Sequence, residues 1–229
     1  MIHGIWLDRT EFESGILLQE HYSARSRKNH DSFILGLEHP EVITLGIRGD
    51  AQSDIVLSEN PSDNWPVFKI DRGGQATLHS PGQLVIYPIV PLKVLGLGVS
   101  QFIDSLLEAT RVMLLKYQIK AKKNGSGLYT ENGKIAFVGI RIVNGITKHG
   151  ISINVYNDTE LFGKIRSCGV TDARIDRIST DGRVLSLRVV FKTWFEEFER
   201  CVDSSNAIPK NLLKSVVALD MNNSSQIVS

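Results

Sequence analysis

The feature that most constrains the fold is an apolar hairpin in the middle of the chain. Two strand-like runs, Lys134 to Val143 and Ile146 to Val155, are separated by Asn144-Gly145. Asn-Gly suits a two-residue hairpin, because both central residues of that turn need a positive φ. We therefore expect two adjacent antiparallel strands here. A second turn, Glu131-Asn132-Gly133, joins them to a shorter strand at residues 127–130.

Strand-like and helix-like segments alternate along the rest of the chain without a fixed repeat, which predicts an α/β or α+β domain. Thr10 and Glu13 fit a capping box that opens a helix ending near Arg27. Apolar residues spaced three and four apart predict two more helices, over 100–117 with Ser100 as its cap and over 187–202. A short helical stretch is expected at 160–164. The other expected strands are 2–7, 32–38 paired with 42–46 across His39-Pro40, 67–70, 75–79, 84–89 and 119–122.

The length of 229 residues fits one generous domain, which can bury a full core without disulfides or a metal. We expect the domain to cover residues 1–202 and a polar, poorly ordered tail to cover 203–229, because the tail is rich in Ser and Asn. A net charge of +1, spread in short mixed runs, argues against a nucleic-acid partner. The cysteines show no metal-ligand spacing, so no metal is expected.

The composition also bears on where the protein works. Two cysteines are too few for a secreted disulfide framework and suit a reducing cytoplasm. The first residues lack the charged and apolar segments of a signal peptide. The longest apolar stretch, residues 84–99, contains two prolines and a lysine, which makes it a poor membrane span. We expect a cytoplasmic protein with no membrane partner.

The most unusual segment runs from Arg72 to Gln83. Its adjacent glycines suit a backbone that comes close to a ligand, with Arg72 and His79 supplying charge and proton-transfer capacity. The alternative is an ordinary hairpin with a solvated arginine. The segment matches neither the dinucleotide-binding nor the P-loop glycine pattern, so neither of those mechanisms is supported.

Cys168 lies between small residues in a predicted loop, where a substrate can approach it, whereas Cys201 lies in an aromatic helix and is expected to pack. A free thiol has a pKa of about 8.5, so a nucleophilic Cys168 needs a nearby cation. The candidates are Lys134, His79 and His149. The alternatives are a buried, unreactive cysteine, a solvated turn lysine and structural histidines.

Together these segments resemble the octanoyltransferases, the lipoyl(octanoyl) transferases of lipoate synthesis, which share a fold with biotin and lipoate protein ligases. The resemblance runs from about Ile34 to Thr171. It rests on Glu38-His39-Pro40 with Thr44-Leu45-Gly46, on the Arg72 to Gln83 segment, on Gly133 to Ile140, on His149 to Val155 and on Ser167-Cys168-Gly169. It implies a single domain with a mixed, largely antiparallel central sheet flanked by helices.

The resemblance also implies the chemistry. Cys168 would form an acyl thioester with Lys134 as its partner, the donor would be octanoyl-acyl carrier protein, and the acceptor would be a lysine of a lipoyl domain in a 2-oxoacid dehydrogenase or of the glycine-cleavage carrier protein. No cofactor is required, because exchange between thioesters is nearly isoenergetic. The acyl pocket would be lined by Arg72, Gly73, Gly74, Gln75, Ala76, Thr77, Leu78, His79, Phe137, Val138, Gly139, Gly150, Ile151 and Ser152.

Two departures from the family pattern affect this pocket. Leu78 stands where the family usually has an aromatic residue, and Phe137 stands where a small residue is common, so we expect a reshaped tunnel. Three other functions remain open from the residues. They are an ATP-dependent lipoate or biotin ligase, a non-catalytic binder of acyl or carrier proteins, and a hydrolase that pairs Cys168 with His79 or His149.

Overall fold

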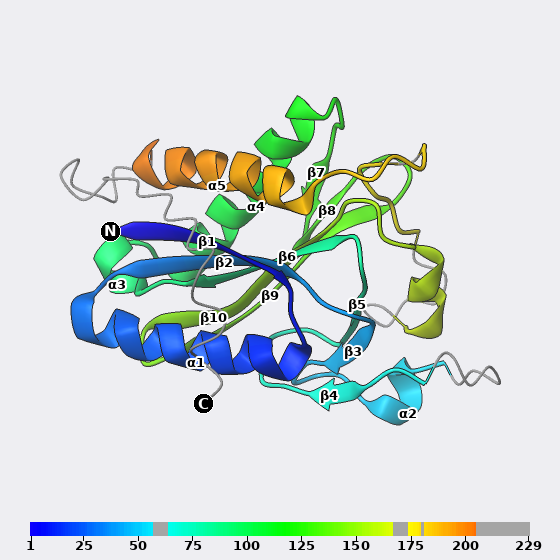
Figure 1. The fold of residues 1–229 in the computed structure, drawn as a ribbon, viewed down its shortest axis with the longest axis horizontal. Coiled ribbons are helices and arrows are strands. Elements are labelled where there is room, and N and C mark those ends of the chain that lie inside the picture. The colour runs from blue at the N-terminus through cyan, green and yellow to red at the C-terminus, as the bar shows by residue number, and fades with distance from the viewer. Residues whose placement is uncertain (57–63, 167–173, 180, 205–229) are drawn as a thin grey trace.

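The protein is built on two sheets with helices on both sides (Figure 1). The computed structural model describes residues 1–56, 64–166, 174–179 and 181–204. Within these ranges the strands are β1 (Ile2–Arg9), β2 (Ser32–Glu38), β3 (Val42–Leu45), β4 (Val67–Lys69), β5 (Ala76–His79), β6 (Gln83–Ile89), β7 (Lys122–Asn124), β8 (Gly127–Tyr129), β9 (Lys134–Val143) and β10 (Ile146–Asn154). The helices are α1 (Phe12–Asn29), α2 (Ala51–Asp54), α3 (Leu92–Leu95), α4 (Val99–Lys116), the 3-10 helix η2 (Glu160–Lys164) and α5 (Leu187–Ser204).

In the described residues the larger sheet has seven strands in the order β1-β2-β6-β10-β9-β8-β7. Strands β1 and β2 are parallel, and every other pair is antiparallel. The expected mixed, largely antiparallel sheet is therefore confirmed. The predicted hairpin is also confirmed, because β9 and β10 pair across Asn144 and Gly145, which both have a positive φ.

The core lies on both faces of this sheet. Helices α4 and α5 pack together over one face, where Trp194, Phe198 and Phe102 are fully buried. The indole Nε1–H of Trp194 donates to the hydroxyl of Thr110 on α4, which satisfies a buried polar pair. Helix α1 covers the opposite face and packs Tyr22 against Phe33 (Figure 1). Cys201 packs against the α4–α5 core as expected.

The smaller sheet has the order β4-β3-β5 and forms a separate layer beside α1. Strand β3 does not pair with β2, so the expected strand pair across His39-Pro40 is wrong. The chain changes sheets there, and His39 is buried at the crossing between them. This change of sheets places the start of β5 opposite β9 and β10, where the two sheets enclose a cavity.

Three local predictions are also wrong. The Thr10 hydroxyl donates to the carbonyl oxygens of Leu7 and Asp8 and caps no helix, so α1 begins only at Phe12. Helix α4 is capped by Gly98 rather than Ser100, because the Gln101 side chain accepts from the Gly98 N–H. The strand expected at 119–122 begins only at Lys122.

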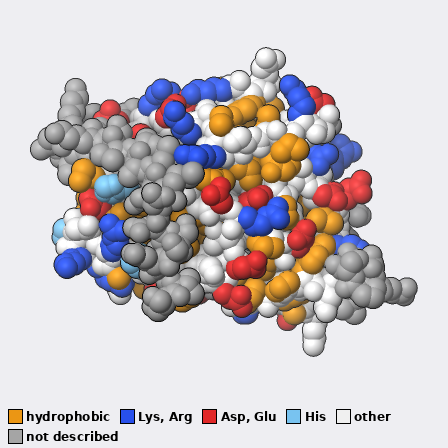
Figure 2. Space-filling view, viewed as in Figure 1, with side chains coloured by type: hydrophobic (Ala, Val, Ile, Leu, Met, Phe, Trp, Pro, Cys, Tyr) orange, Lys and Arg blue, Asp and Glu red, His pale blue; other side chains and the backbone are white. Residues whose placement is uncertain are grey.

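The surface matches the near-neutral composition. On the face seen in Figure 2, Lys and Arg side chains are interspersed with Asp and Glu. Several are paired, as in the ion pair between Arg111 and Glu108 on α4. No helix in the described residues combines the length and the apolar character that crossing a membrane requires.

Candidate active site

A cavity of about 250 Å³ lies between the two sheets. Its walls come from the segment before and along β5, from the middle of β9 and β10, and from Val85 and Tyr87 on β6. All of the predicted pocket residues line it except Leu78, whose side chain is fully buried among Ile43, Phe162 and their neighbours. The structure thus brings together residues that lie up to 80 positions apart in the sequence.

The glycine segment forms one wall because its backbone packs closely against other backbone. Gly74 has a φ of +92°, which favours glycine. The Gly73 N–H donates to the carbonyl oxygen of Ile140 on β9 at 3.2 Å. Gly139 faces this contact, and a Cβ there would lie 3.1 Å from the Gly73 oxygen. The glycine segment therefore lies close against β9, and the close approach to a ligand that the sequence suggests stays a prediction.

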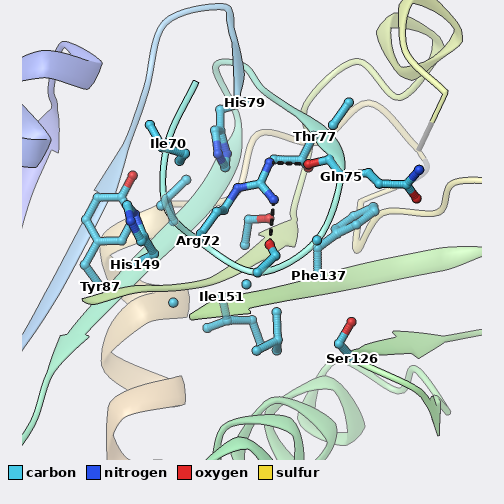
Figure 3. Close-up of a pocket in the computed structure, with 18 of the residues that line it drawn as sticks. Ile70, Arg72, Gln75, Thr77, His79, Tyr87, Ser126, Phe137, His149 and Ile151 are labelled. Carbon is cyan, nitrogen blue, oxygen red and sulfur yellow. Dashed lines mark hydrogen bonds between the residues drawn. The ribbon is translucent and has the colours of Figure 1, made fainter. Parts of the chain in front are cut away.

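Arg72 holds this segment in place. Arg72 is only 8% exposed, and its guanidinium donates to the carbonyl oxygens of Thr44, Gly73 and Gln75 at 2.6, 2.9 and 2.8 Å. Figure 3 marks the bond to Gln75. The solvated-arginine alternative is therefore wrong. Charge-assisted bonds of this kind are the stronger class of hydrogen bond, so Arg72 fixes the shape of the wall as well as carrying charge beside the cavity.

Two buried histidines and a tyrosine form a polar cluster at the β5–β6 side. His79 Nδ1 lies 2.7 Å from Gln83 Oε1, and His39 Nε2 lies 2.8 Å from the Tyr87 hydroxyl. Burial lowers the pKa of His79 to about 3, with the His39 charge as the next cause. Burial likewise lowers the pKa of His39 to about 4. Both imidazoles are therefore neutral at pH 7.

Tyr87 and the His39 contact are functional candidates that sequence reasoning missed. His39 was noticed only as part of a short motif, and no local pattern links it to Tyr87, 48 residues away. Burial raises the pKa of Tyr87, so its phenol stays protonated and can donate a hydrogen bond.

His149 lies beside Tyr87 in the cavity wall and has a strained backbone conformation (Figure 3). Its φ of +55° is rare for a residue other than glycine. Its N–H donates to Gln19 Oε1, and its Nε2 lies 2.9 Å from Asp71 Oδ1. Burial lowers the pKa of His149, and the bond to Asp71 opposes that shift. Strain of about 1–3 kcal/mol that is retained beside a cavity often marks a functional position.

Lys134 begins β9 and lines the same cavity. Its side chain is 6% exposed, so the solvated-turn alternative is wrong. The ammonium nitrogen lies 4.6 Å from the ring centroid of Phe137 and 5.5 Å from that of Tyr129. The Lys134 N–H donates to the carbonyl oxygen of Arg174 at 2.8 Å, and the Asp176 N–H donates to the Lys134 carbonyl oxygen at 3.0 Å.

Cys168 lies outside the described residues, together with its neighbours Ser167 and Gly169. The described chain stops at Arg166, whose N–H donates to the carbonyl oxygen of Asp54, and resumes at Arg174 beside Lys134. Among the residues that are described, no cluster of three His, Cys, Asp or Glu side chains could hold a metal ion.

The sequence and the fold match a known class of protein. Residues 16–199 match the family model of the lipoyl protein ligase A/B catalytic domain. Lipoate-protein ligase A, solved with bound ATP, superposes with a TM-score of 0.71 at 14% identity, covering 89% of this chain and 86% of that one. The chain belongs to the lipoyl protein ligase A/B catalytic domain family, and the predicted fold class is confirmed.

Proteins whose sequences are more similar to this chain identify a group of enzymes within the family. The octanoyltransferase of Shewanella halifaxensis is 39% identical over 170 residues, which are 73% of this chain and 75% of that protein. The octanoyltransferase of Shewanella baltica is 37% identical over 171 residues, with 73% and 76% covered. The chain is accordingly a transferase enzyme of the octanoyltransferase group, and octanoyl transfer in lipoate biosynthesis is its activity.

Proposed function

We propose that this enzyme takes an octanoyl group from octanoyl-acyl carrier protein onto Cys168 and passes it to a lysine of a lipoyl domain. The observation that carries the proposal is the position of Lys134, buried in the cavity wall and bonded through its backbone to Arg174 and Asp176. Arg174, which follows Cys168 by six residues in the sequence, lies beside Lys134 and supports this pairing.

The first step forms the acyl-enzyme. A Cys168 thiolate attacks the carbonyl carbon of the donor thioester, the new C–S bond forms, and the bond to the carrier sulfur breaks. The carrier thiolate takes a proton from the Lys134 ammonium and leaves as a thiol. The neighbouring ammonium favours the attacking thiolate, since an opposite charge within about 6 Å stabilises a charged group.

The second step forms an amide. The now neutral Lys134 amine takes one proton from the ammonium of the acceptor lysine, and the freed amine attacks the thioester carbon. The C–N bond forms, the bond to Cys168 breaks, and the second amine proton passes to solvent. The thiolate and the Lys134 ammonium are restored, so the cycle balances without ATP.

The cavity supports an acyl substrate. Val138 and Ile151 contribute apolar walls from adjacent strands, where they face one another in the β9–β10 register. Each methylene buried there would contribute about 0.8 kcal/mol, so the length of the slot would set the preferred chain length. The volume of about 250 Å³ is close to the lower end of the range of small-molecule sites, which is roughly 300–1,000 Å³.

Three further points remain proposals. The acceptor would be a lipoyl domain of a 2-oxoacid dehydrogenase or the glycine-cleavage carrier protein, and the enzyme would work in the cytoplasm. Residues 1–202 would make up the domain. The described part of α5 extends to Ser204, and the proposed tail beyond it lies outside the described residues.

Intact mass spectrometry tests the proposal. Enzyme mixed with octanoyl-acyl carrier protein should gain one octanoyl group, and Cys168→Ala should gain none, while Cys201→Ala, the matched control, should be acylated normally. No adduct on the unaltered enzyme, or an adduct that survives Cys168→Ala, would contradict it. Pyrophosphate release that depends on free octanoic or lipoic acid would instead favour the ATP-dependent ligase.

A further inference from the structure

Lys134 reaches the cavity because β9 contains an irregularity. Gly127 pairs with Phe137 and Leu128 pairs with Ala136, but Tyr129 pairs with Lys134, so Ile135 has no partner of its own on β8. Residues three apart in a regular strand face opposite sides of the sheet. One extra residue reverses that alternation and re-aims the side chain beyond it. Lys134 and Phe137 therefore share one face, and both line the cavity.

The side chain of Lys134 then crosses the strand pair over a glycine. A Cβ at Gly127 would lie 2.5 Å from Lys134 Cε, closer than side chains pack, so only glycine leaves this path open. The path ends between two aromatic rings, Tyr129 and Phe137, with the shorter distance to Phe137. The Phe137 ring is itself fixed, because it stacks on Phe162 of η2 with centroids 5.3 Å apart and planes 12° apart.

We infer that Phe137 is a positioning residue for the reaction, whose ring face holds the Lys134 ammonium at the cavity wall where the thioester reacts. The negative face of an aromatic ring attracts a cation within about 6 Å, and more strongly where water is excluded. A lysine has a long, freely rotating side chain, so a fixed ring reduces the number of positions its nitrogen can take. This inference rests on the proposed function, in which Lys134 exchanges protons with the substrates.

A graded change in the ring tests the electrostatic contact. Phenylalanine analogues with one, two and three ring fluorines at position 137 keep nearly the same shape but weaken the negative ring face stepwise. We expect kcat for octanoyl transfer to a lipoyl domain to fall with each fluorine, by roughly 5- to 30-fold in total, with KM for the octanoyl carrier unchanged. The same trifluoro analogue at Phe162, which stacks behind Phe137, is the matched control and should leave kcat within about twofold.

The variant Phe137→Leu distinguishes two roles of the ring. One is to position the Lys134 ammonium, and the other is to limit the length of the acyl chain. If the ring holds the ammonium, this variant loses a similar factor in kcat with hexanoyl, octanoyl and decanoyl donors. If the ring only limits the slot, kcat with the octanoyl donor stays the same and longer donors react faster. The second result, or a flat fluorine series, would overturn the inference.

Two parallel variants distinguish failure of the inference from failure of the proposed function. When Cys168→Ala and Lys134→Met abolish transfer but the fluorine series is flat, the acyl-enzyme mechanism stands and only the role of Phe137 is refuted. When Cys168→Ala still transfers the octanoyl group, the proposed function fails, and the inference fails with it.

Discussion

Two buried cations line the same cavity and are held in opposite ways. The N–H groups of Arg72 donate to the carbonyl oxygens of Thr44 on β3 and of Gly73 and Gln75 in the glycine segment. The ammonium of Lys134 lies over aromatic rings on a strand whose register is irregular. An arginine bound to several backbone carbonyl oxygens fixes the shape of the segment around it, whereas an ammonium over ring faces is held by contacts that are less directional. We propose that the glycine wall has a structural role and that the β9 wall takes part in the reaction.

Replacing each cation by methionine gives the sharpest test of this contrast. Lys134→Met should lower the rate of octanoyl transfer by about 10²–10⁴-fold, the usual contribution of a positioned acid or base. Its free energy of unfolding should change by no more than about 1 kcal/mol, because methionine keeps the apolar part of the side chain and removes the cost of burying an ammonium. Single-turnover kinetics and urea unfolding measure both effects. Activity within tenfold of the unaltered enzyme would refute the chemical role.

Arg72→Met should show the reverse pattern. The substitution leaves the carbonyl oxygens of Thr44, Gly73 and Gln75 buried without these donors. Each lost hydrogen bond costs about 1–3 kcal/mol of folding free energy before the surrounding structure relaxes. We expect the free energy of unfolding to fall by about 3 kcal/mol or more. Urea titration measures this loss, and a variant as stable as Lys134→Met would remove the distinction between the two walls.

We expect acid to destabilise the folded protein through the two buried histidines beside the cavity, His39 and His79. The unfolded histidines take up protons below pH 6.5, but in the folded protein His39 and His79 stay neutral down to pKa values of about 4 and 3. The folded state therefore loses stability as pH falls from 6.5 towards 4, by about 2 kcal/mol for each histidine between pH 7 and pH 5. Urea unfolding at both pH values measures this loss.

The variant His79→Gln checks the assignment of the pH effect. It should lose less stability between pH 7 and pH 5 than the unaltered protein, by the share of one histidine, about 2 kcal/mol. The same substitution at His21, which is exposed on α1, is the matched control. An equal dependence on pH in both variants would show that His79 is not the group responsible.

The smallest effect is expected at the glycine beneath Lys134. Gly127→Ala adds a methyl group where Lys134 Cε lies, so the ammonium must move and kcat should fall by about tenfold. Gly163→Ala on η2 is the control, because a Cβ there has nothing within 4 Å. The added methyl group would also lie 2.8 Å from the Ala136 carbonyl oxygen, so the unfolding free energy must be measured as well. Equal kcat in both variants would contradict the inference that the Lys134 side chain crosses over Gly127.

The sequence could predict some elements of the fold and not others. Periodic and turn signals act locally, and they located β9, β10, α5 and the Asn144-Gly145 turn. These local signals could not predict which strands pair when the strands are distant in the sequence. The change of sheets after β2 depends on which strands β3 meets in space, and no pattern near His39 records it. Capping residues were misassigned because Ser, Thr and Gly are all common cap residues, and the sequence does not show which residue the backbone places at the helix start.

The candidate site shows the same division. The residues of the pocket were predicted from the resemblance to the octanoyltransferases, and the sheets bring all of them but Leu78 to one cavity. How they act depends on contacts between distant segments. The carbonyl partners of Arg72 and the irregular pairing at Ile135 could not be read from spacing. Spacing alone would place Lys134 and Phe137 on opposite faces of β9.

The most direct test of the central claim is a crystal structure of the octanoyl-enzyme. We predict that the octanoyl carbonyl carbon is bonded to Cys168 Sγ, that the acyl chain lies between β9, β10 and the glycine segment, and that Sγ lies within about 6 Å of Lys134 Nζ. An Sγ–Nζ separation well beyond that distance, or an acyl group attached elsewhere, would contradict the pairing of Cys168 with Lys134.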